Sequence, residues 1–475
     1  MAEPWPEALV EPGGGWDAIV VGAGPAGLAA ATLLAQRGAR TLVLDEQPEP
    51  GGQIYRGIER AQQRPEAGLL GKDYFHGAAL VRAFRESGAA YLPETGVWNM
   101  TRGLRLHASR MGESRELRAR ALILAVGAIE RPVPLPGWTL PGVMTAGAVQ
   151  ILLKSAMLRA DVPLVIAGSG PLLYLLAAQC HAAGAPIAAL LDTSSRENLP
   201  SALRHLPRAL RGRGPSYLMK GMGLMLGLRR AGIPVFRGAS GIELHGRERV
   251  EAVGFAAGGR THLLPAGIVA LHEGVIPRQN ATRLIGCDQA WDGSQHAFRP
   301  VTDEWGHTSV AAILAAGDAA GIVGARGAEH QGRIAALGIL RDLGRLDTAQ
   351  AELLARKERR ELHGHAAVRP FLDRLYPPPR QVLVPADATT ACRCEEVTAG
   401  AVRELAERGY GANQIKAELR CGMGPCQGRL CGPTVTAIIS AARGAAPEAA
   451  DYYNIRPPLK PLAMSELASL PAGRD

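Results

Sequence analysis

Aromatic residues are scarce in this sequence, since Phe, Trp and Tyr make up only 4% of its 475 residues. A nucleic-acid surface usually combines clustered basic residues with aromatic rings that stack on bases. Here Lys and Arg are scattered and lack such rings. The formal net charge of +9 therefore predicts no nucleic-acid partner, and it suits an acidic protein or a phosphate-bearing cofactor.

The N-terminus lacks the features of a signal peptide, because residues 1–17 carry acids where bases are needed and contain no apolar core. Two uncharged stretches, residues 18–36 and 162–191, resemble membrane spans in length, but each contains a Gly-x-Gly-Pro turn. We interpret each stretch as a buried strand, a turn and a helix. The sequence predicts a cytoplasmic protein without a transmembrane segment.

Length and turn content indicate several α/β domains. A chain of 475 residues is too long for one hydrophobic core, and about two to four domains are expected. The 58 Gly and 34 Pro, with 47% hydrophobic residues, are typical of a globular α/β protein rich in tight turns. Cys180 and Cys287 are isolated in apolar surroundings and are predicted core residues.

A dinucleotide-binding motif lies near the N-terminus, where an apolar strand precedes Gly-x-Gly-x-x-Gly and a helix, and a second strand ends in an acid. The first glycine permits a tight turn, the second lets the backbone approach a pyrophosphate, and the third allows close helix–strand packing. Asp45 can hold ribose hydroxyls, and Glu46 is the neighbouring alternative. The predicted binding residues are Gly22, Gly24, Pro25, Ala26, Gly27 and Asp45 or Glu46.

Two later apolar strands break at glycine, residues 121–137 at Gly127 and residues 311–321 at Gly317-Asp318. With the first motif, this pattern over about residues 15–345 resembles the two-dinucleotide-binding-domain flavoproteins, the superfamily of thioredoxin reductase and glutathione reductase. The resemblance implies FAD, with Gly317 and Asp318 at its ribityl and pyrophosphate part and Gly52-Gln53 against the flavin. The simpler interpretation of Asp318 is a helix N-cap without a ligand.

A second, altered motif contains Gly168 and Gly170, but the third glycine is replaced by Leu173 and the acid falls at Asp192. A bulky side chain at the third position should push the helix from the strand and loosen the nucleotide fit. NAD(P)H, another adenine nucleotide and an empty structural domain remain alternatives. The redox cysteine pair of the disulfide reductases is missing from residues 51–60 and from the second domain, which excludes disulfide reduction.

The remaining cysteines cluster near the C-terminus, where Cys392-x-Cys394 and Cys426-x4-Cys431 are separated by 31 residues. In a reducing compartment such clusters indicate metal or redox chemistry. Two thiolate pairs suit the two irons of a 2Fe-2S cluster, and a tetrathiolate zinc site is the structural alternative. The segment resembles the bacterioferritin-associated ferredoxin domain. That resemblance implies the metal ligands Cys392, Cys394, Cys426 and Cys431 and leaves Cys421 as a spare thiol.

Three segments, LDEQPEPGGQIYR, AVGAIERPVPLPGW and CRCEEVT, make nearly the whole chain resemble the large α subunits of heteromeric amine dehydrogenases. This family includes subunits of hydrogen cyanide synthase, opine oxidase and proline or hydroxyproline dehydrogenase. The resemblance implies an FAD- and 2Fe-2S-containing oxidoreductase subunit that works with a β flavoprotein subunit, which oxidises an amino acid's C–N bond. In some members it also implies a ferredoxin-like γ subunit, or a further adenine nucleotide or FMN at a subunit interface.

Two other functions remain open at this point. An NAD(P)H-dependent flavin reductase would pass electrons through the cluster to an external acceptor, but it requires a functional second motif. A scaffold with vestigial cofactors conflicts with the intact first motif. The predicted fold is a Rossmann-like FAD-binding domain (15–155 and 285–345) with an inserted NAD(P)-binding-like domain (156–284), a linker (346–385), a small helical 2Fe-2S-binding domain (386–442) and a C-terminal tail (443–475).

Overall fold

A largely parallel sheet around β1 (Trp16–Val21) organises the N-terminal part of the computed structural model, which describes residues 5–6 and 15–470. The strands lie in the order β3 (Ala90–Leu92), β2 (Thr41–Leu44), β1, β6 (Glu113–Leu124), β5 (Arg105–Arg110) and β4 (Thr95–Met100), and β19 (Ile313–Ala315) pairs with β6. Because β1, β2, β6 and β19 are parallel, their carboxyl ends meet at one edge of the sheet.

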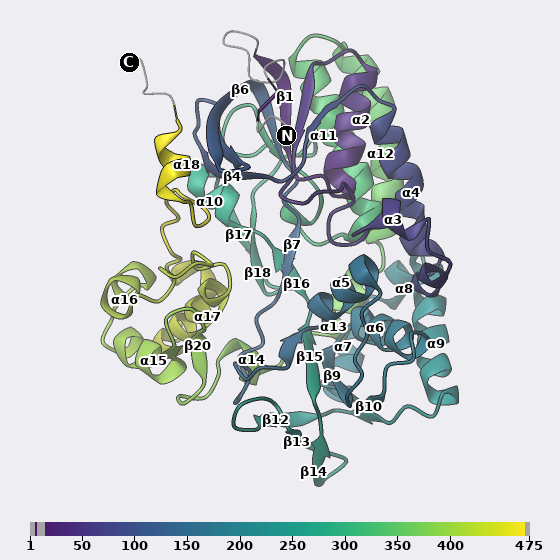
Figure 1. The fold of residues 1–475 in the computed structure, drawn as a ribbon, viewed down its shortest axis with the longest axis vertical. Coiled ribbons are helices and arrows are strands. Elements are labelled where there is room, and N and C mark those ends of the chain that lie inside the picture. Colours follow the sequence, from purple (N-terminus) through teal and green to yellow (C-terminus); the bar gives the residue numbers. More distant parts are fainter. Residues whose placement is uncertain (1–4, 7–14, 471–475) are drawn as a thin grey trace.

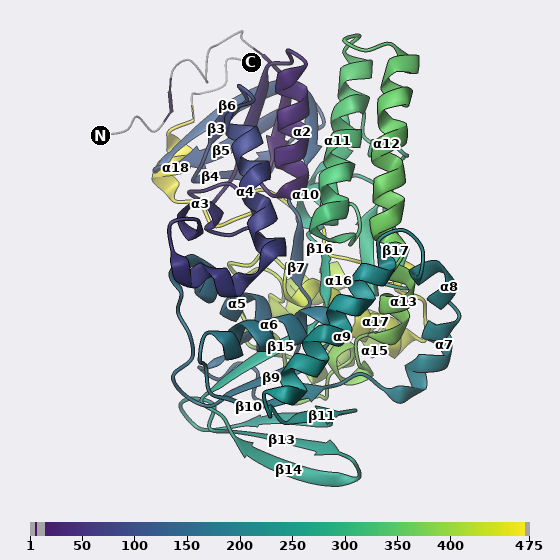
Figure 2. The ribbon, with the colours of Figure 1, turned by 90° about the vertical axis from the view of Figure 1, so that its right-hand side faces the viewer.

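Helices cover one face of this sheet (Figure 2). They are α2 (Pro25–Gln36), α4 (Lys72–Arg85) and α11 (Gly324–Asp342), and the short α3 (Ile58–Ala61) and η1 (Pro65–Leu70) contact α4. Gly332 of α11 lies against Ala26 of α2, where a Cβ would fall 2.0 Å from the Ala26 carbonyl oxygen. The two helices therefore pack backbone to backbone, which joins two parts of the chain that are far apart in sequence.

A second parallel sheet has the order β11 (Val235–Arg237), β10 (Ile187–Asp192), β9 (Leu164–Ser169), β15 (Ile268–Glu273) and β8 (Val143–Thr145). Its helices are α5 (Ala146–Ala156), α6 (Pro171–Ala182), η2 (Arg196–Asn198), α7 (Leu199–Leu203), α8 (Leu206–Ala209) and α9 (Gly214–Arg230). An antiparallel sheet, β12 (Ser240–His245), β13 (Ala252–Ala257) and β14 (Arg260–Pro265), extends from it. β8 thus joins the second sheet, although the predicted FAD-binding range extended to residue 155.

Short elements connect the two sheets. They are β7 (Ala128–Glu130) with β16 (Val275–Pro277), α10 (Asn280–Ile285), and β17 (Gln289–Asp292) with β18 (Ala297–Pro300), whereas η3 (Gly317–Ala319) leads from β19 to α11. The predicted linker at 346–385 is mostly helical and contains α12 (Thr348–Ala366), α13 (Arg369–Leu375) and α14 (Arg380–Leu383). α12 packs along α11 and begins at a capping box formed by Asp347 and Gln350.

The C-terminal helical unit lies beside both sheets (Figure 1). It contains β20 (Thr390–Cys392), β21 (Val397–Thr398), α15 (Ala399–Glu407), α16 (Ala412–Leu419), α17 (Cys431–Arg443) and η4 (Pro447–Ala449). The chain then returns to the first sheet, where Leu459 N–H donates to the Trp98 carbonyl at 2.8 Å. α18 (Met464–Ala468) packs on β6, so the predicted tail is docked up to this helix.

Within the described part of the chain, none of the helices combines the length and the apolar character that crossing a bilayer requires.

Candidate cofactor-binding sites

A cavity of about 1770 Å³ connects the three structural units. Gly24, Gly127 and Asp318 line it from the first sheet, Gly170 lines it from the second sheet, and Arg429 lines it from the cysteine-containing unit. Ligands of open α/β sheets bind beyond the carboxyl ends of the strands, and the first motif, Asp45, Gly127 and Gly317 all follow such ends at one edge. The fold therefore brings distant sequence motifs to one cavity.

The glycines of the first motif meet three different steric demands. A Cβ at Gly22 would lie 2.4 Å from the Ala125 carbonyl oxygen, and a Cβ at Gly27 would lie 1.9 Å from the Gly22 carbonyl oxygen. At Gly24 the nearest atom would be 3.9 Å away, on Gly52. Pro25 opens helix α2 directly after Gly24, so the unpaired N–H groups of that helix end meet the cavity.

The two candidate ribose-binding acids have different surroundings. Asp45 accepts hydrogen bonds from Ala23 N–H at 2.5 Å and Gln47 N–H at 2.7 Å, which fixes its carboxylate beside the glycine loop. Burial raises the pKa of Asp45 in spite of these bonds. Burial also opposes ionisation of Glu46, but the adjacent Lys460 ammonium lowers the pKa of Glu46 overall. Asp45 is thus held by the first motif, whereas Glu46 forms an ion pair with Lys460 of the returning C-terminal segment.

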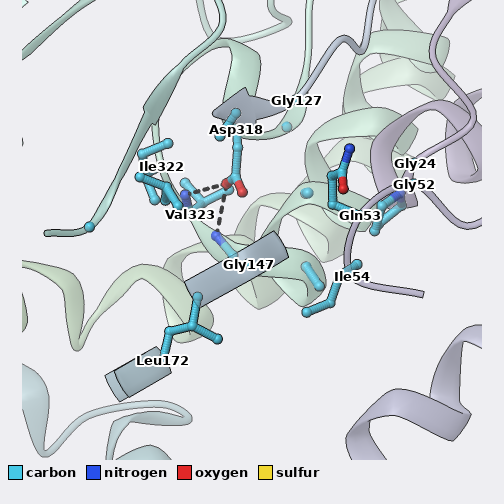
Figure 3. Close-up of a pocket in the computed structure, with 18 of the residues that line it drawn as sticks. Gly24, Gly52, Gln53, Ile54, Gly127, Gly147, Leu172, Asp318, Ile322 and Val323 are labelled. Carbon is cyan, nitrogen blue, oxygen red and sulfur yellow. Dashed lines mark hydrogen bonds between the residues drawn. The ribbon is translucent and has the colours of Figure 1, made fainter. Parts of the chain in front are cut away.

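Gly52 lies directly beside Gly24 of the first motif, and Gln53 follows it along the cavity (Figure 3). Gly51 N–H donates to the Ala23 carbonyl at 2.8 Å, and Gly52 has φ of +62°. A Cβ at Gly52 would lie 2.8 Å from the Gly24 Cα, so only glycine fits this approach. Gly127 has φ of +69° and open space where its Cβ would be, so its backbone also faces the cavity.

Asp318 follows the carboxyl end of β19, and Figure 3 shows its carboxylate with the two hydrogen bonds that it accepts. Its Oδ1 accepts hydrogen bonds from Val323 N–H at 2.8 Å and Gly324 N–H at 3.0 Å, at the start of α11. Burial raises the pKa of Asp318. Among the described residues, Oδ2 has no hydrogen-bond partner, so the carboxylate can serve the helix start and a ligand together. Gly317 holds the turn at φ of +71°.

The second motif has the first two glycines, whereas large side chains occupy the third glycine position and the residue after it. A Cβ at Gly168 would lie 1.7 Å from the His272 carbonyl oxygen, whereas Gly170 lines the cavity with open space beside it. Leu173 is fully buried between helix α6 and its sheet. The next residue, Tyr174, donates its hydroxyl to Asp192 Oδ2, and Ser194 N–H donates to Oδ1 at 2.9 Å. Both oxygens of the predicted ribose-binding acid are therefore engaged by the protein.

Two buried ionisable residues that line the cavity were missed from the sequence. Glu273 accepts hydrogen bonds from the hydroxyls of Ser169 and Thr193, each at 2.7 Å, and burial raises its pKa to about 7. Lys154 lies under the backbone of Gln53, and burial lowers its pKa to about 7. The only sequence signal was one charge on an otherwise apolar strand or helix, which is weak on its own.

The structure brings the clustered cysteines together around the start of α17. The sulfurs of Cys392, Cys421 and Cys431 lie within 4.8 Å of one another, and all three residues are buried. Cys426 contacts Cys431 and the more exposed Cys394. Donation from the Cys421 and Cys431 thiols holds the pKa of Cys392 far below its ordinary value, and donation from Cys431 lowers the pKa of Cys426 to about 5. The environment thus favours the thiolate, the form that binds metal, at Cys392 and Cys426, whereas hydrogen bonds to neighbouring sulfurs raise the pKa of Cys421 and Cys431.

Cys421, predicted as the spare thiol, lies inside this group. The Tyr453 hydroxyl donates to Cys421 Sγ at 3.2 Å and lies 3.8 Å from Cys431 Sγ. Gly422 and Gly428 adopt positive φ and pack against the Tyr453 ring, which shapes the loop between the thiols. Tyr453 is a contact that sequence reasoning missed.

The cysteine loop also reaches the first motif's cavity. Arg429 and Leu430, immediately before Cys431, line the cavity that Gly24 and Asp318 line. Asn280 of the connecting segment donates to the Gln427 carbonyl at 2.9 Å, which fixes the loop against it. A centre held by these thiols would thus be separated from the cavity by little more than its own ligand loop.

Comparison with known proteins identifies the class of protein to which this chain belongs. A family model described as pyridine nucleotide-disulphide oxidoreductase matches residues 16–336. The A subunit of opine oxidase from Rhizobium meliloti (strain 1021) is 48% identical over 467 residues, covering 96% of this chain and 99% of the relative. Hydrogen cyanide synthase subunit HcnB of Pseudomonas aeruginosa is 34% identical, covering 87% of this chain and 90% of the relative.

A solved structure supports the fold. L-proline dehydrogenase from P. horikoshii aligns over 95% of this chain and 79% of its own, with a TM-score of 0.68 and 21% identity. The chain is a flavin-dependent oxidoreductase with two dinucleotide-binding units, and it belongs to the pyridine nucleotide-disulphide oxidoreductase family, in the group that contains the opine oxidase A subunits. The predicted family and fold class are therefore confirmed.

Proposed function

We propose that this chain is the electron-transferring subunit of a heteromeric dehydrogenase that oxidises the C–N bond of an amino or imino acid of the opine, proline, hydroxyproline or glycine class. The observation that carries the proposal is the shared cavity, which Gly24 and Asp318 line on one side and the loop before Cys431 on the other. Similarity to the opine oxidase A subunits and to hydrogen cyanide synthase subunit HcnB supports the substrate class.

The first motif and its neighbours fit FAD. The N–H groups at the start of α2 would hold the pyrophosphate above Gly24, where the structure leaves open space. Asp45, fixed beside that loop, would bind the ribose hydroxyls, and the unpartnered oxygen of Asp318 would accept from the ribityl chain. Gly52-Gln53 and Gly127 would border the flavin. When bound, FAD accepts electrons in pairs and a 2Fe-2S cluster passes them on singly.

For the metal centre we propose a 2Fe-2S cluster on Cys392, Cys394, Cys426 and Cys431. The pairing of a Cys-x-Cys with a Cys-x4-Cys segment supports two thiolates per iron. Cys421 would then help to bury the site together with Tyr453. A zinc centre explains the thiols equally well but not their position beside the cavity.

The cluster assignment is tested by serine substitution at each cysteine. Visible absorption and iron content should be lost in the Cys392, Cys394, Cys426 and Cys431 variants and retained in Cys421→Ser, the matched control within the same group. A bleached Cys421→Ser variant with an intact Cys394→Ser variant would reassign the ligands. If protein purified anaerobically contained zinc and no iron, the centre would be a structural zinc site and not a 2Fe-2S cluster.

The NAD(P)H-dependent flavin reductase receives no support from the second motif. A ribose at Asp192 would have to displace the Tyr174 hydroxyl and the Ser194 N–H. An adenine nucleotide held near Gly168 and Gly170, or FMN at a subunit interface, stays a prediction. So do a cytoplasmic location and a small ferredoxin-like γ subunit.

The substrate site is proposed to lie on a β flavoprotein partner. The chain purified alone should contain flavin and iron but show negligible dye reduction with proline, hydroxyproline, glycine or opines. Adding the β partner should restore activity with one of these substrates, with the β partner alone as the control. Equal turnover by the isolated chain would place the substrate site here and overturn the division of labour.

A further inference from the structure

A second group of metal-ligand side chains lies between helices α11 and α12, apart from the cysteines. His330 comes from α11, and Glu361 and His365 come from α12, with ligand atoms within 4.8 Å of one another. Glu361 and His365 are four positions apart, so they project from the same face of α12. All three residues are half-buried and line the large cavity.

Hydrogen bonds orient both imidazole rings. His330 Nδ1 lies 2.7 Å from Glu358 Oε2, and His365 Nδ1 lies 2.7 Å from the Tyr217 hydroxyl. The two rings stack at 5.6 Å between centroids with 22° between their planes. Within the part of the chain that the structure describes, Nε2 of either ring has no hydrogen-bond partner. Metal-binding histidines in proteins use this pattern, in which a carboxylate or hydroxyl holds one nitrogen and the metal takes the other.

The charges around the group are mixed. Glu358 and Glu361 contribute two carboxylates, and each is approached by one guanidinium. The Arg213 Nη2 to Glu361 Oε2 distance is 3.4 Å, and the Arg333 Nη1 to Glu358 Oε2 distance is 3.5 Å. The Arg213 side chain is 60% exposed, so it can turn to solvent when a cation takes the carboxylate. An exposed ion pair such as Arg213–Glu361 contributes little stability, so it does not block a metal at Glu361.

We propose that His330, Glu361 and His365 form a binding site for a divalent first-row transition metal ion, of which Zn²⁺ is the reference. The ion would be held by Nε2 of each ring and by one Glu361 oxygen. Two histidines and one carboxylate form a typical three-ligand set with an open position. Because the ligands line the cavity, the open position faces it and can take water or an anionic ligand.

Co²⁺ distinguishes this site from the cysteine centre, because nitrogen and oxygen ligands give ligand-field bands without the thiolate charge-transfer band. The full-length chain, with its cysteine centre loaded, should bind about one Co²⁺ with such a spectrum, and Zn²⁺ should displace it. A spectrum with thiolate charge transfer only, or no binding, overturns the proposal. This test on the unmodified chain does not depend on the folding of any variant.

Substitutions then assign the ligands. Even loss of an outer hydrogen-bond partner typically weakens metal binding about 10- to 100-fold. His365→Gln and Glu361→Gln should therefore weaken Co²⁺ binding by about 100-fold or more, and Glu358→Gln by about 10-fold. His363→Gln, on the exposed face of the same helix, is the matched control and should bind normally. Equal affinity in His365→Gln and His363→Gln, with flavin content and circular dichroism unchanged, contradicts the assignment.

Discussion

The two Gly-x-Gly motifs of this chain share a strand–turn–helix frame but differ in what occupies it. Around the first motif, open space lies over Gly24 and the acid Asp45 is held by backbone N–H groups. Around the second, Leu173 fills the third position and Tyr174 caps the acid Asp192. The second motif thus differs from the first at the third glycine position and at the residue after it, which engages the acid that a ribose would need. A shared frame does not by itself make a binding site.

The largest expected effect is loss of FAD from the first motif. Gly24 has φ of −80° and no atom within 3.9 Å of its Cβ position, so Gly24→Val should fold. Its branched side chain would occupy the pyrophosphate's place, and flavin content should fall close to zero. Gly170→Ala at the matched position should keep full flavin content, although φ of +94° with ψ of 170° costs about 1–3 kcal/mol of stability. A normal flavin content in Gly24→Val would show that the first motif does not bind FAD.

The next effect is a pH dependence that belongs to the second unit. Burial raises the pKa of Glu273 from 4.5 to about 7, so the folded state keeps a proton that the unfolded state releases. The resulting stability is complete below pH 4.5 and is lost as pH rises to about 7. Glu273→Gln should lack this loss, so its stability relative to wild type should rise by about 3 kcal/mol across that window.

The control for this measurement is Glu46→Gln in the first unit. Lys460 lowers the pKa of Glu46, so its contribution is present at neutral pH and lost on acidification. Urea denaturation at several pH values should give opposite signs for the two variants. A Glu273→Gln difference that is flat with pH would mean that Glu273 is ionised in the folded protein.

The smallest effect concerns the tyrosine cap. Tyr174→Phe leaves one oxygen of the buried Asp192 unsatisfied and should cost about 1–3 kcal/mol by denaturation. Flavin content should stay unchanged, because the first motif is intact. NADH and NADPH should still fail to reduce the flavin, since Leu173 remains in place. Reduction by NADH in this variant would mean that the tyrosine alone closes an otherwise working site.

The sequence was informative where one local pattern determines the geometry. The first motif and the order of strand and helix around Leu173 follow from residues that are adjacent in the chain. The missed contacts join residues far apart in sequence, such as Lys460 with Glu46 and Tyr453 with Cys421. The direction of the Tyr174 hydroxyl likewise depends on how α6 packs against its sheet. No local pattern contains this information.

The most direct test of the central claim follows electrons through the reconstituted complex. With the β partner present and oxygen excluded, amine substrate should reduce the flavin, bleach the cluster absorption and produce the electron paramagnetic resonance signal of a reduced 2Fe-2S cluster. NADH and NADPH should produce neither change. A cluster that stays oxidised while substrate turns over, or one that NADH reduces in the isolated chain, would contradict electron transfer from the amine through this subunit.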